Sequence, residues 1–122
     1  MASSINKEEM YERTLQFSVR VIAMIEAMPK SPSAHSIALQ LSRSATSIGA
    51  NYREACHAKS FNDFAYKLKI CEGEADETLY WLQVIVRSGL MKPSKMQALI
   101  DEANALVAIF TAACKTAYQK RK

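Results

Sequence analysis

Side chains capable of nucleophilic or acid–base chemistry are few in this chain of 122 residues, and their spacing does not bring them together. On a helix, Ser47 and His57 would lie about 15 Å apart along the axis. Cys56 and His57 are adjacent, so their side chains would point about 100° apart, and no second pair at metal-finger spacing follows. No glycine-rich phosphate loop or HExxH motif occurs. We therefore expect no enzymatic activity, no metal and no cofactor.

Acidic residues cluster between Glu72 and Glu77. A carboxylate-bridged metal site in a helical bundle also needs inward-facing Glu-x-x-His repeats, and neither His35 nor His57 completes one. Ion pairing across helices is the better interpretation of Glu74 and Glu77. The candidate partners are three arginines: Arg43, Arg53 and Arg20.

Lysine and arginine are the remaining candidates with a mechanism, because they bind phosphate by charge and, for arginine, through a bidentate fork. The net charge is +4. Basic residues outnumber acidic ones by four to one in residues 29–60 and by five to two in residues 93–122, so an anionic partner such as RNA is possible. A solvated face without a partner is the alternative. The predicted nucleic-acid-binding residues are Arg43, Arg53, Lys59, Lys67, Lys69, Arg87, Lys92 and Lys95.

The elements that carry these residues are helical. Three glycines and three prolines leave material for a few long elements only. Apolar residues recur at alternating steps of three and four, which is typical of a helix with one face in a core. The sequence predicts an all-α protein with a single domain over residues 1–122 and helices at about 7–28, 34–59, 61–88 and 94–119. Their short connections favour an antiparallel, up-down-up-down four-helix bundle.

Capping signals mark the ends of these helices. Asn6 begins a sequence like a capping box, and Ser33 and Ser60 are the predicted N-caps of the second and third helices. Gly89, followed by a leucine, predicts a Schellman stop at the end of the third helix.

Two further glycines lie inside predicted helices, where glycine costs about 1 kcal/mol relative to alanine. Close approach of a second helix is the usual reason to keep one. Gly49 and Gly73 lie 11 and 13 residues on either side of Ser60. In an antiparallel hairpin they would share nearly the same height, so we predict that the second and third helices approach most closely there.

The first and third helices carry nearly two apolar rows each, more than a monomeric bundle needs. Homo-oligomerisation is the favoured interpretation, and a generous core is the alternative. Aromatic residues such as Tyr52 and Tyr66 can also stack on unpaired bases, although at helical spacing they are typical of a core or a subunit interface. The predicted oligomer interface consists of Tyr11, Leu15, Tyr80 and Trp81.

No signal peptide is predicted at the start of the chain, and the apolar run at residues 105–114 is about half the length of a membrane span. The three cysteines, Cys56, Cys71 and Cys114, contain no CxxC pair, which favours reduced, buried thiols. We expect a cytoplasmic protein with neither a membrane nor a small-molecule substrate as partner.

The run from Gln40 to Leu82 resembles the four-helix-bundle family of bacterial 23S rRNA intervening-sequence proteins, most specifically in RSATSIGANYREA, SFNDF and ETLYWL. The likeness extends more weakly to YERTLQFSVRVI and to the last helix. It implies a cytoplasmic bundle that assembles as a ring-like homopentamer. A related branch, the accessory proteins of diversity-generating retroelements, is similar in fold, binds nucleic acid and a reverse transcriptase, and is more basic than this chain.

The combined interpretation is a non-enzymatic, oligomeric scaffold associated with RNA or a ribonucleoprotein. Five copies would raise the charge to about +20, enough to attract RNA where one copy would not. The alternatives are a protein–protein interaction adaptor and a reverse-transcriptase accessory protein of a retroelement.

Overall fold

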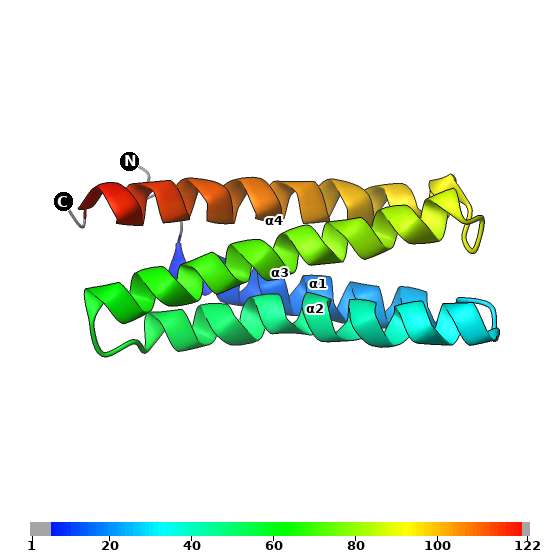
Figure 1. The fold of residues 1–122 in the computed structure, drawn as a ribbon, viewed down its shortest axis with the longest axis horizontal. Coiled ribbons are helices and arrows are strands. Elements are labelled where there is room, and N and C mark those ends of the chain that lie inside the picture. The colour runs from blue at the N-terminus through cyan, green and yellow to red at the C-terminus, as the bar shows by residue number, and fades with distance from the viewer. Residues whose placement is uncertain (1–5, 121–122) are drawn as a thin grey trace.

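Residues 6–120 are described by a computed structural model, and they form four α-helices with no strand among them. The all-α prediction is confirmed. The helices lie side by side, with the α1–α2 and α3–α4 connections at one end and the α2–α3 connection at the other (Figure 1). The helices are α1 (Lys7–Glu26), α2 (Pro32–Cys56), α3 (Phe61–Arg87) and α4 (Pro93–Lys120).

Side-chain caps start the first three helices. The Asn6 and Ser60 side chains accept a hydrogen bond from the backbone N–H three residues on, at 3.0 and 3.1 Å, as predicted. The prediction for α2 is wrong by two residues, because Ser31 and not Ser33 is the N-cap, at 3.2 Å from the nitrogen of Ala34. Pro32 explains the shift: its fixed φ suits the first helical position, where no N–H is needed.

The end of α3 follows the predicted Schellman pattern. Gly89 has a φ of +81°, in the left-handed region that favours glycine. The backbone nitrogens of Gly89 and Leu90 donate to the carbonyls of Val86 and Ile85, both at 3.1 Å. The first two helices end two to three residues earlier than predicted, at Glu26 and Cys56.

Neither Gly49 nor Gly73 makes the close contact between α2 and α3 for which it was predicted. Gly49 lies against α1, where an added Cβ would be 2.8 Å from the Thr14 hydroxyl oxygen. Gly73 is exposed, and nothing lies within 4 Å of the place where its Cβ would be. Height along the axis does not fix rotation about it, and the two glycines point to different sides of the bundle.

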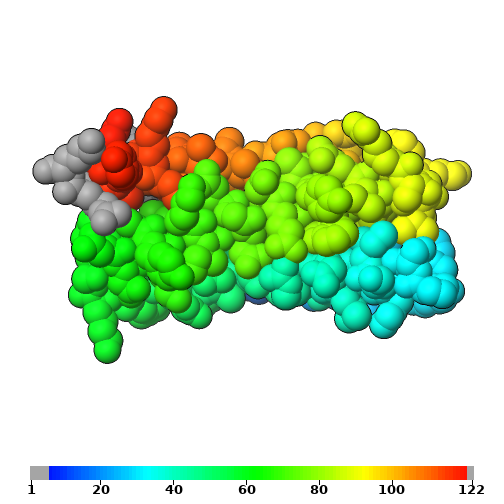
Figure 2. Space-filling model, viewed as in Figure 1, coloured from blue at the N-terminus to red at the C-terminus, as the bar shows by residue number. Residues whose placement is uncertain are grey.

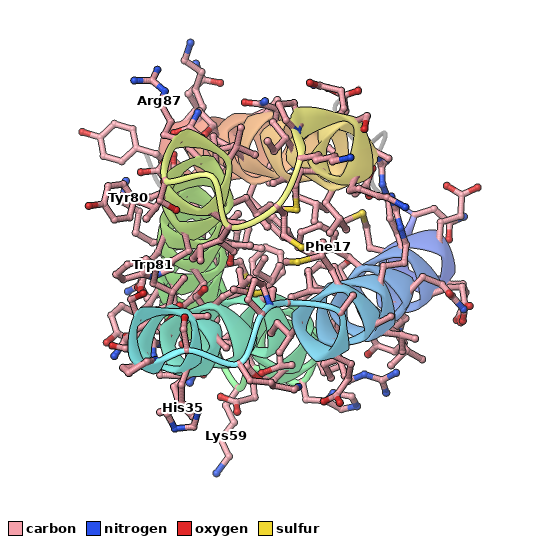
Figure 3. All side chains as sticks on the ribbon, turned by 90° about the vertical axis from the view of Figure 1, so that its right-hand side faces the viewer. Phe17, His35, Lys59, Tyr80, Trp81 and Arg87 are labelled. Atoms are coloured by element: carbon pink, nitrogen blue, oxygen red, sulfur yellow. The ribbon has the colours of Figure 1, made fainter. Side chains whose placement is uncertain are left out.

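All four helices contribute to one core. Phe17, Leu41, Leu82 and Phe110 are among its fully buried side chains. In the end-on view, Phe17 lies between the helices, whereas the labelled polar residues point outwards (Figure 3). In the space-filling view, α3 crosses the front of the molecule between α4 and α2 (Figure 2).

The three cysteines are free thiols. Cys71 is fully buried, and burial raises its pKa to about 12. Cys56 and Cys114 are half-buried, so the prediction of buried thiols holds fully for Cys71 alone.

Helix α4 supplies the core with a row that includes Met96, Leu106 and Phe110. By length and composition alone it could also cross a membrane, as the core helix of a soluble protein often can, with a mean hydropathy of 1.2 over its most apolar 18-residue window. Within the chain, 22% of that window is buried. Apolar surface therefore remains on this helix outside the core.

Candidate nucleic-acid interface

The eight predicted cationic residues do not form one patch. Three of them are neutralised by carboxylates, one lies on an aromatic ring, and four are exposed without an ion pair to residues 6–120. Whether a cation can hold a phosphate depends on this difference, because a carboxylate partner competes directly with the phosphate oxygens.

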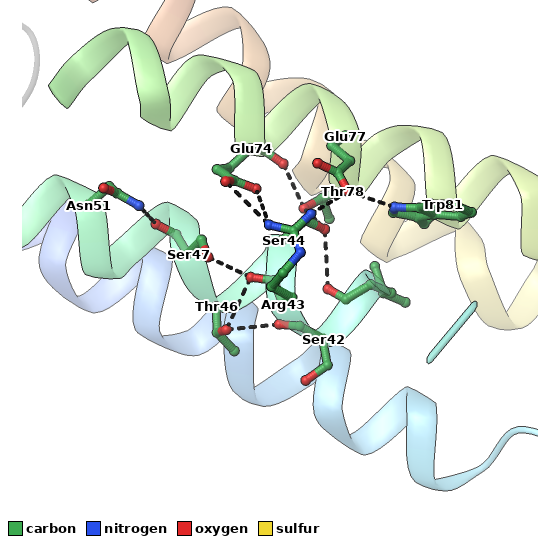
Figure 4. Close-up of polar contacts among 11 residues, drawn as sticks. Ser42, Arg43, Ser44, Thr46, Ser47, Asn51, Glu74, Glu77, Thr78 and Trp81 are labelled. Carbon is green, nitrogen blue, oxygen red and sulfur yellow. Dashed lines mark hydrogen bonds and ion pairs between the residues drawn. The ribbon is translucent and has the colours of Figure 1, made fainter. Parts of the chain in front are cut away.

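Arg43 belongs to a closed polar cluster on the outer side of α2 and α3 (Figure 4). Its guanidinium bonds Glu77 and lies 3.4 Å from Glu74, so the predicted pairing of these carboxylates is confirmed with Arg43 as the partner. Trp81 donates its indole N–H to Glu77 at 3.0 Å. The hydrogen bond from Trp81, followed by that from Arg43, holds the pKa of the Glu77 carboxyl below its usual range. Two carboxylates against one guanidinium make this cluster unfavourable for phosphate.

The Arg43 cluster lies above a buried hydrogen bond. The hydroxyls of Ser44 and Thr78, both fully buried, are 2.9 Å apart and join α2 to α3 (Figure 4). Each hydroxyl also lies within hydrogen-bond distance of a backbone carbonyl of its own helix. Together these contacts close the α2–α3 seam with polar groups.

Two predicted lysines are paired in the same way. Lys67 bonds Glu54 at 2.6 Å, and Lys69 bonds Glu72 at 2.9 Å. The hydrogen bond from Lys69, followed by one from Thr111, lowers the pKa of Glu72. The Lys67–Glu54 pair joins α3 to α2, whereas the Lys69–Glu72 pair lies within α3. Both pairs leave little free positive charge on these lysines.

Three of the exposed cations gather at the end of the bundle that carries the α1–α2 and α3–α4 connections. Arg87 is the last residue of α3, and Lys92 and Lys95 flank the start of α4. Lys30, in the α1–α2 connection, lies at the same end and was not among the predicted residues. Arg87 points away from the bundle in the end-on view (Figure 3). We call Lys30, Arg87, Lys92 and Lys95 the cationic end.

The composition of this end is what sets it apart. Residues 26–35 and 84–97 contain these four cations and a single carboxylate, that of Glu26. All four cations are exposed. Lys59 is exposed in the connection at the opposite end. Lys30 was missed because a lone lysine between two prolines has no helical spacing. An up-down bundle nevertheless predicts that the first and third connections meet at one end.

The four predicted interface residues divide into two groups. Leu15 and Tyr80 are 49% and 56% exposed. Tyr11 is half-buried, and Trp81 is half-buried with its ring centroid 5.0 Å from that of Tyr80. The predicted interface omitted two more exposed hydrophobic side chains on α1, which follow Leu15 at steps of four and three residues. We call these three residues the α1 stripe: Leu15, Val19 and Ile22.

An apolar groove of about 1000 Å³ separates the start of α1 from the end of α4. An ion pair between Arg13 and Glu102, at 2.6 Å, joins the two helices. Within residues 6–120, no group of three or more His, Cys, Asp or Glu side chains is placed to hold a metal ion. The apolar lining of the groove includes Met10, Phe64, Leu68, Ile109 and Ala113.

Comparison with known proteins agrees with this architecture. The sequence model of the 23S rRNA-intervening sequence protein family matches residues 6–112. No curated protein matches the chain. The crystal structures that match include a protein of unknown function from the S23 ribosomal protein family of Bacteroides thetaiotaomicron, with 30% identity and a TM-score of 0.80 over 87% of this chain and 98% of that one. The chain belongs to the family of 23S rRNA-intervening sequence proteins.

Proposed function

We propose that this protein is a cytoplasmic, non-enzymatic scaffold that binds RNA or a ribonucleoprotein through its cationic end. The observation that carries the proposal is the composition of that end, where four exposed cations stand against one carboxylate. Cations without a carboxylate partner keep their N–H donors for phosphate oxygens, and each phosphate neutralised releases counterions from the RNA.

Assembly is the second part of the proposal. We propose that up-down-up-down bundles join as a ring-like homo-oligomer, a pentamer, through exposed apolar side chains. The α1 stripe supports this, because its three members are 44–53% exposed on one helical face. A ring would repeat the cationic end around its axis, so that about 20 cations in five copies act on one RNA.

A binding series with 23S rRNA fragments tests the RNA proposal. We expect fluorescence anisotropy to show binding at about 50 mM salt that weakens steeply as salt rises. Replacing Lys30, Arg87, Lys92 and Lys95 together with glutamine is expected to abolish most of this binding and to flatten its salt dependence. Absence of binding by the native protein at low salt would reject the proposal.

A matched control uses the neutralised cations. Replacing Arg43, Lys67 and Lys69 with glutamine removes a similar amount of positive charge from pairs that already contain a carboxylate. We expect this variant to keep most of the affinity for RNA. An equal loss in both variants would show that net charge alone, and not the cationic end, determines binding.

Sedimentation tests the assembly. The native protein is expected to sediment as a multiple of the 13.6 kDa chain, and Val19→Asp is expected to dissociate it. Val19 is 53% exposed, so the substitution leaves the core of the single chain intact. A native protein that remains monomeric at high concentration would reject the assembly.

The groove between α1 and α4 favours a second candidate function, a protein-interaction adaptor. Its apolar lining at the surface offers a partner protein a place to bury a helix. A partner captured in the presence of nuclease, and lost in an Ala113→Glu variant, would favour the adaptor over the RNA scaffold.

A further inference from the structure

Arg53, the predicted cation that lies on an aromatic ring, caps a row of aromatic side chains that runs from the core to the surface. The Arg53 Cζ atom lies 4.6 Å from the centroid of the Tyr11 ring. Tyr11 contacts Tyr52 edge-to-face, with ring centroids 5.8 Å apart. Tyr52 contacts Phe110 in the same manner at 5.9 Å. Three helices, α4, α2 and α1, therefore support the outermost side chain of the row.

The inner members of this row are fixed by burial. Phe110 is 0% exposed and Tyr52 is 4% exposed, so Tyr11 rests on a packed support. Burial raises the pKa of both tyrosine hydroxyls above the usual range, so both rings are neutral at physiological pH. A neutral ring held in place attracts a guanidinium to its face.

The charge of Arg53 is not neutralised by an ion pair with a described carboxylate. Glu54, its neighbour in sequence, bonds Lys67 at 2.6 Å. Glu8 acts electrostatically on Tyr11, but no ion pair joins Arg53 to any acidic residue between 6 and 120. Arg53 is exposed, and the Tyr11 ring lies on one side of its guanidinium, so this cation remains accessible to an external ligand.

A second polar group, His57, lies one turn further along the chain, at the C-cap of α2. The His57 Nδ1 atom is 2.9 Å from the Arg53 carbonyl oxygen. Both side chains are exposed, so Arg53 and His57 are exposed polar groups at the carboxyl end of α2.

We propose that Arg53, held over the ring of Tyr11, binds an unpaired nucleotide of RNA. The base stacks on the open face of the guanidinium, and the N–H edge donates to the adjacent phosphate. Proteins recognise single-stranded RNA by stacking bases on aromatic rings and guanidinium planes. A duplex conceals its base faces, so this site discriminates single strands from duplexes, which the cationic end does not. The inference rests on the proposed association with RNA.

The test measures the affinity of the full protein chain for a labelled oligouridine and for an RNA duplex of equal length. Arg53→Lys keeps the charge but loses the plane and the fork. We expect it to weaken binding of the single strand about tenfold and binding of the duplex less than about twofold. Arg43→Lys is the matched control, because Arg43 lies on the same helix and its charge is already neutralised; it should change neither affinity.

Tyr11 variants separate support from charge. Tyr11→Phe keeps the ring and should bind the single strand like the native protein, whereas Tyr11→Leu should lose affinity as Arg53→Lys does. Circular dichroism checks that each variant folds. If Tyr11→Leu does not fold, the comparison of Arg53→Lys with Tyr11→Phe still tests the inference.

The outcomes are distinguishable. Equal weakening of single strand and duplex, or no effect of Arg53→Lys on either, overturns this inference while leaving the cationic end in place. A native protein that binds neither RNA overturns the proposed function and this inference together.

Discussion

Arg43 and Arg53 project from the same helix, ten residues apart, and meet opposite surroundings. Arg43 lies at the α2–α3 seam, where two carboxylates and an indole N–H form a closed set of hydrogen bonds. Arg53 lies at the α1–α2 seam, where its partner is the face of a tyrosine ring. The first guanidinium contributes to the packing of two helices, and the second retains its charge for an external anion.

The two seams differ beneath these arginines as well. The α2–α3 seam contains the buried pair of Ser44 and Thr78, whose hydroxyls bond across the interface. The α1–α2 seam is tightly packed because Gly49 has no side chain, which lets Thr14 approach the backbone of α2. The α1–α2 seam also contains a polar contact, from the Ser18 hydroxyl to the Ala45 carbonyl oxygen at 3.4 Å. The buried hydroxyl pair is confined to the α2–α3 seam and the contact of a glycine with a buried side chain to the α1–α2 seam, so substitutions at these positions should affect the two seams differently.

The largest effect is expected at the tightly packed seam. In Gly49→Val, the new Cβ would be 2.8 Å from the Thr14 hydroxyl oxygen and 3.1 Å from its Cβ. Thr14 is 2% exposed and its hydroxyl bonds the Met10 carbonyl at 2.8 Å, so it has little room to move. We expect the free energy of unfolding to fall by about 2–3 kcal/mol, measured by urea denaturation.

Gly73→Val is the control for that substitution. Nothing lies within 4 Å of the place where its Cβ would be, and valine has the higher helix propensity. The variant should be as stable as the native protein or slightly more stable. Comparable destabilisation by both substitutions would contradict the assignment of close packing to the α1–α2 seam.

A smaller effect is expected at the polar seam. Thr78→Val keeps the shape of the side chain and removes its hydrogen bond to Ser44, which then retains its own-helix carbonyl at 3.3 Å. We expect a loss of about 1 kcal/mol by thermal or urea unfolding. In a double-mutant cycle with Ser44→Ala, the second substitution should cost less than it does alone, and strict additivity would show that the hydroxyl pair is not coupled.

The helices and their caps were predictable because their signals are local. Asn6, Ser60 and Gly89 act on backbone groups within four residues, and the apolar period defines each buried row without reference to a partner. Ser31 was missed in favour of Ser33 since both are serines, and only the preference of Pro32 for the first helical position separates them.

The candidate sites depend on rotation about the helix axes, which one sequence does not define. Gly49 was assigned to the wrong partner helix for this reason. Arg43, Arg53 and Arg20 were equivalent candidates for Glu74 and Glu77 until the structure selected Arg43. The stacking of Arg53 on Tyr11 joins residues more than forty positions apart with no pattern between them.

The smallest effect is expected from the ion pair between Glu77 and Arg43, which neutralises the charge of Arg43. Because the folded-state pKa of Glu77 is lowered, its ionised form stabilises the native state above the unfolded pKa, and this contribution is lost as pH falls through the folded pKa. Glu77 and Arg43 are 35% and 50% exposed, so solvent screening limits the contribution to about 0.5 kcal/mol. Glu77→Gln should therefore be less stable than the native protein at pH 7, and urea denaturation should show the difference shrinking below about pH 4.

A difference that stays constant over this range would mean that the indole and packing contacts of Glu77, and not its charge, stabilise the seam. In that case Arg43 would keep more free charge than the comparison with Arg53 allows.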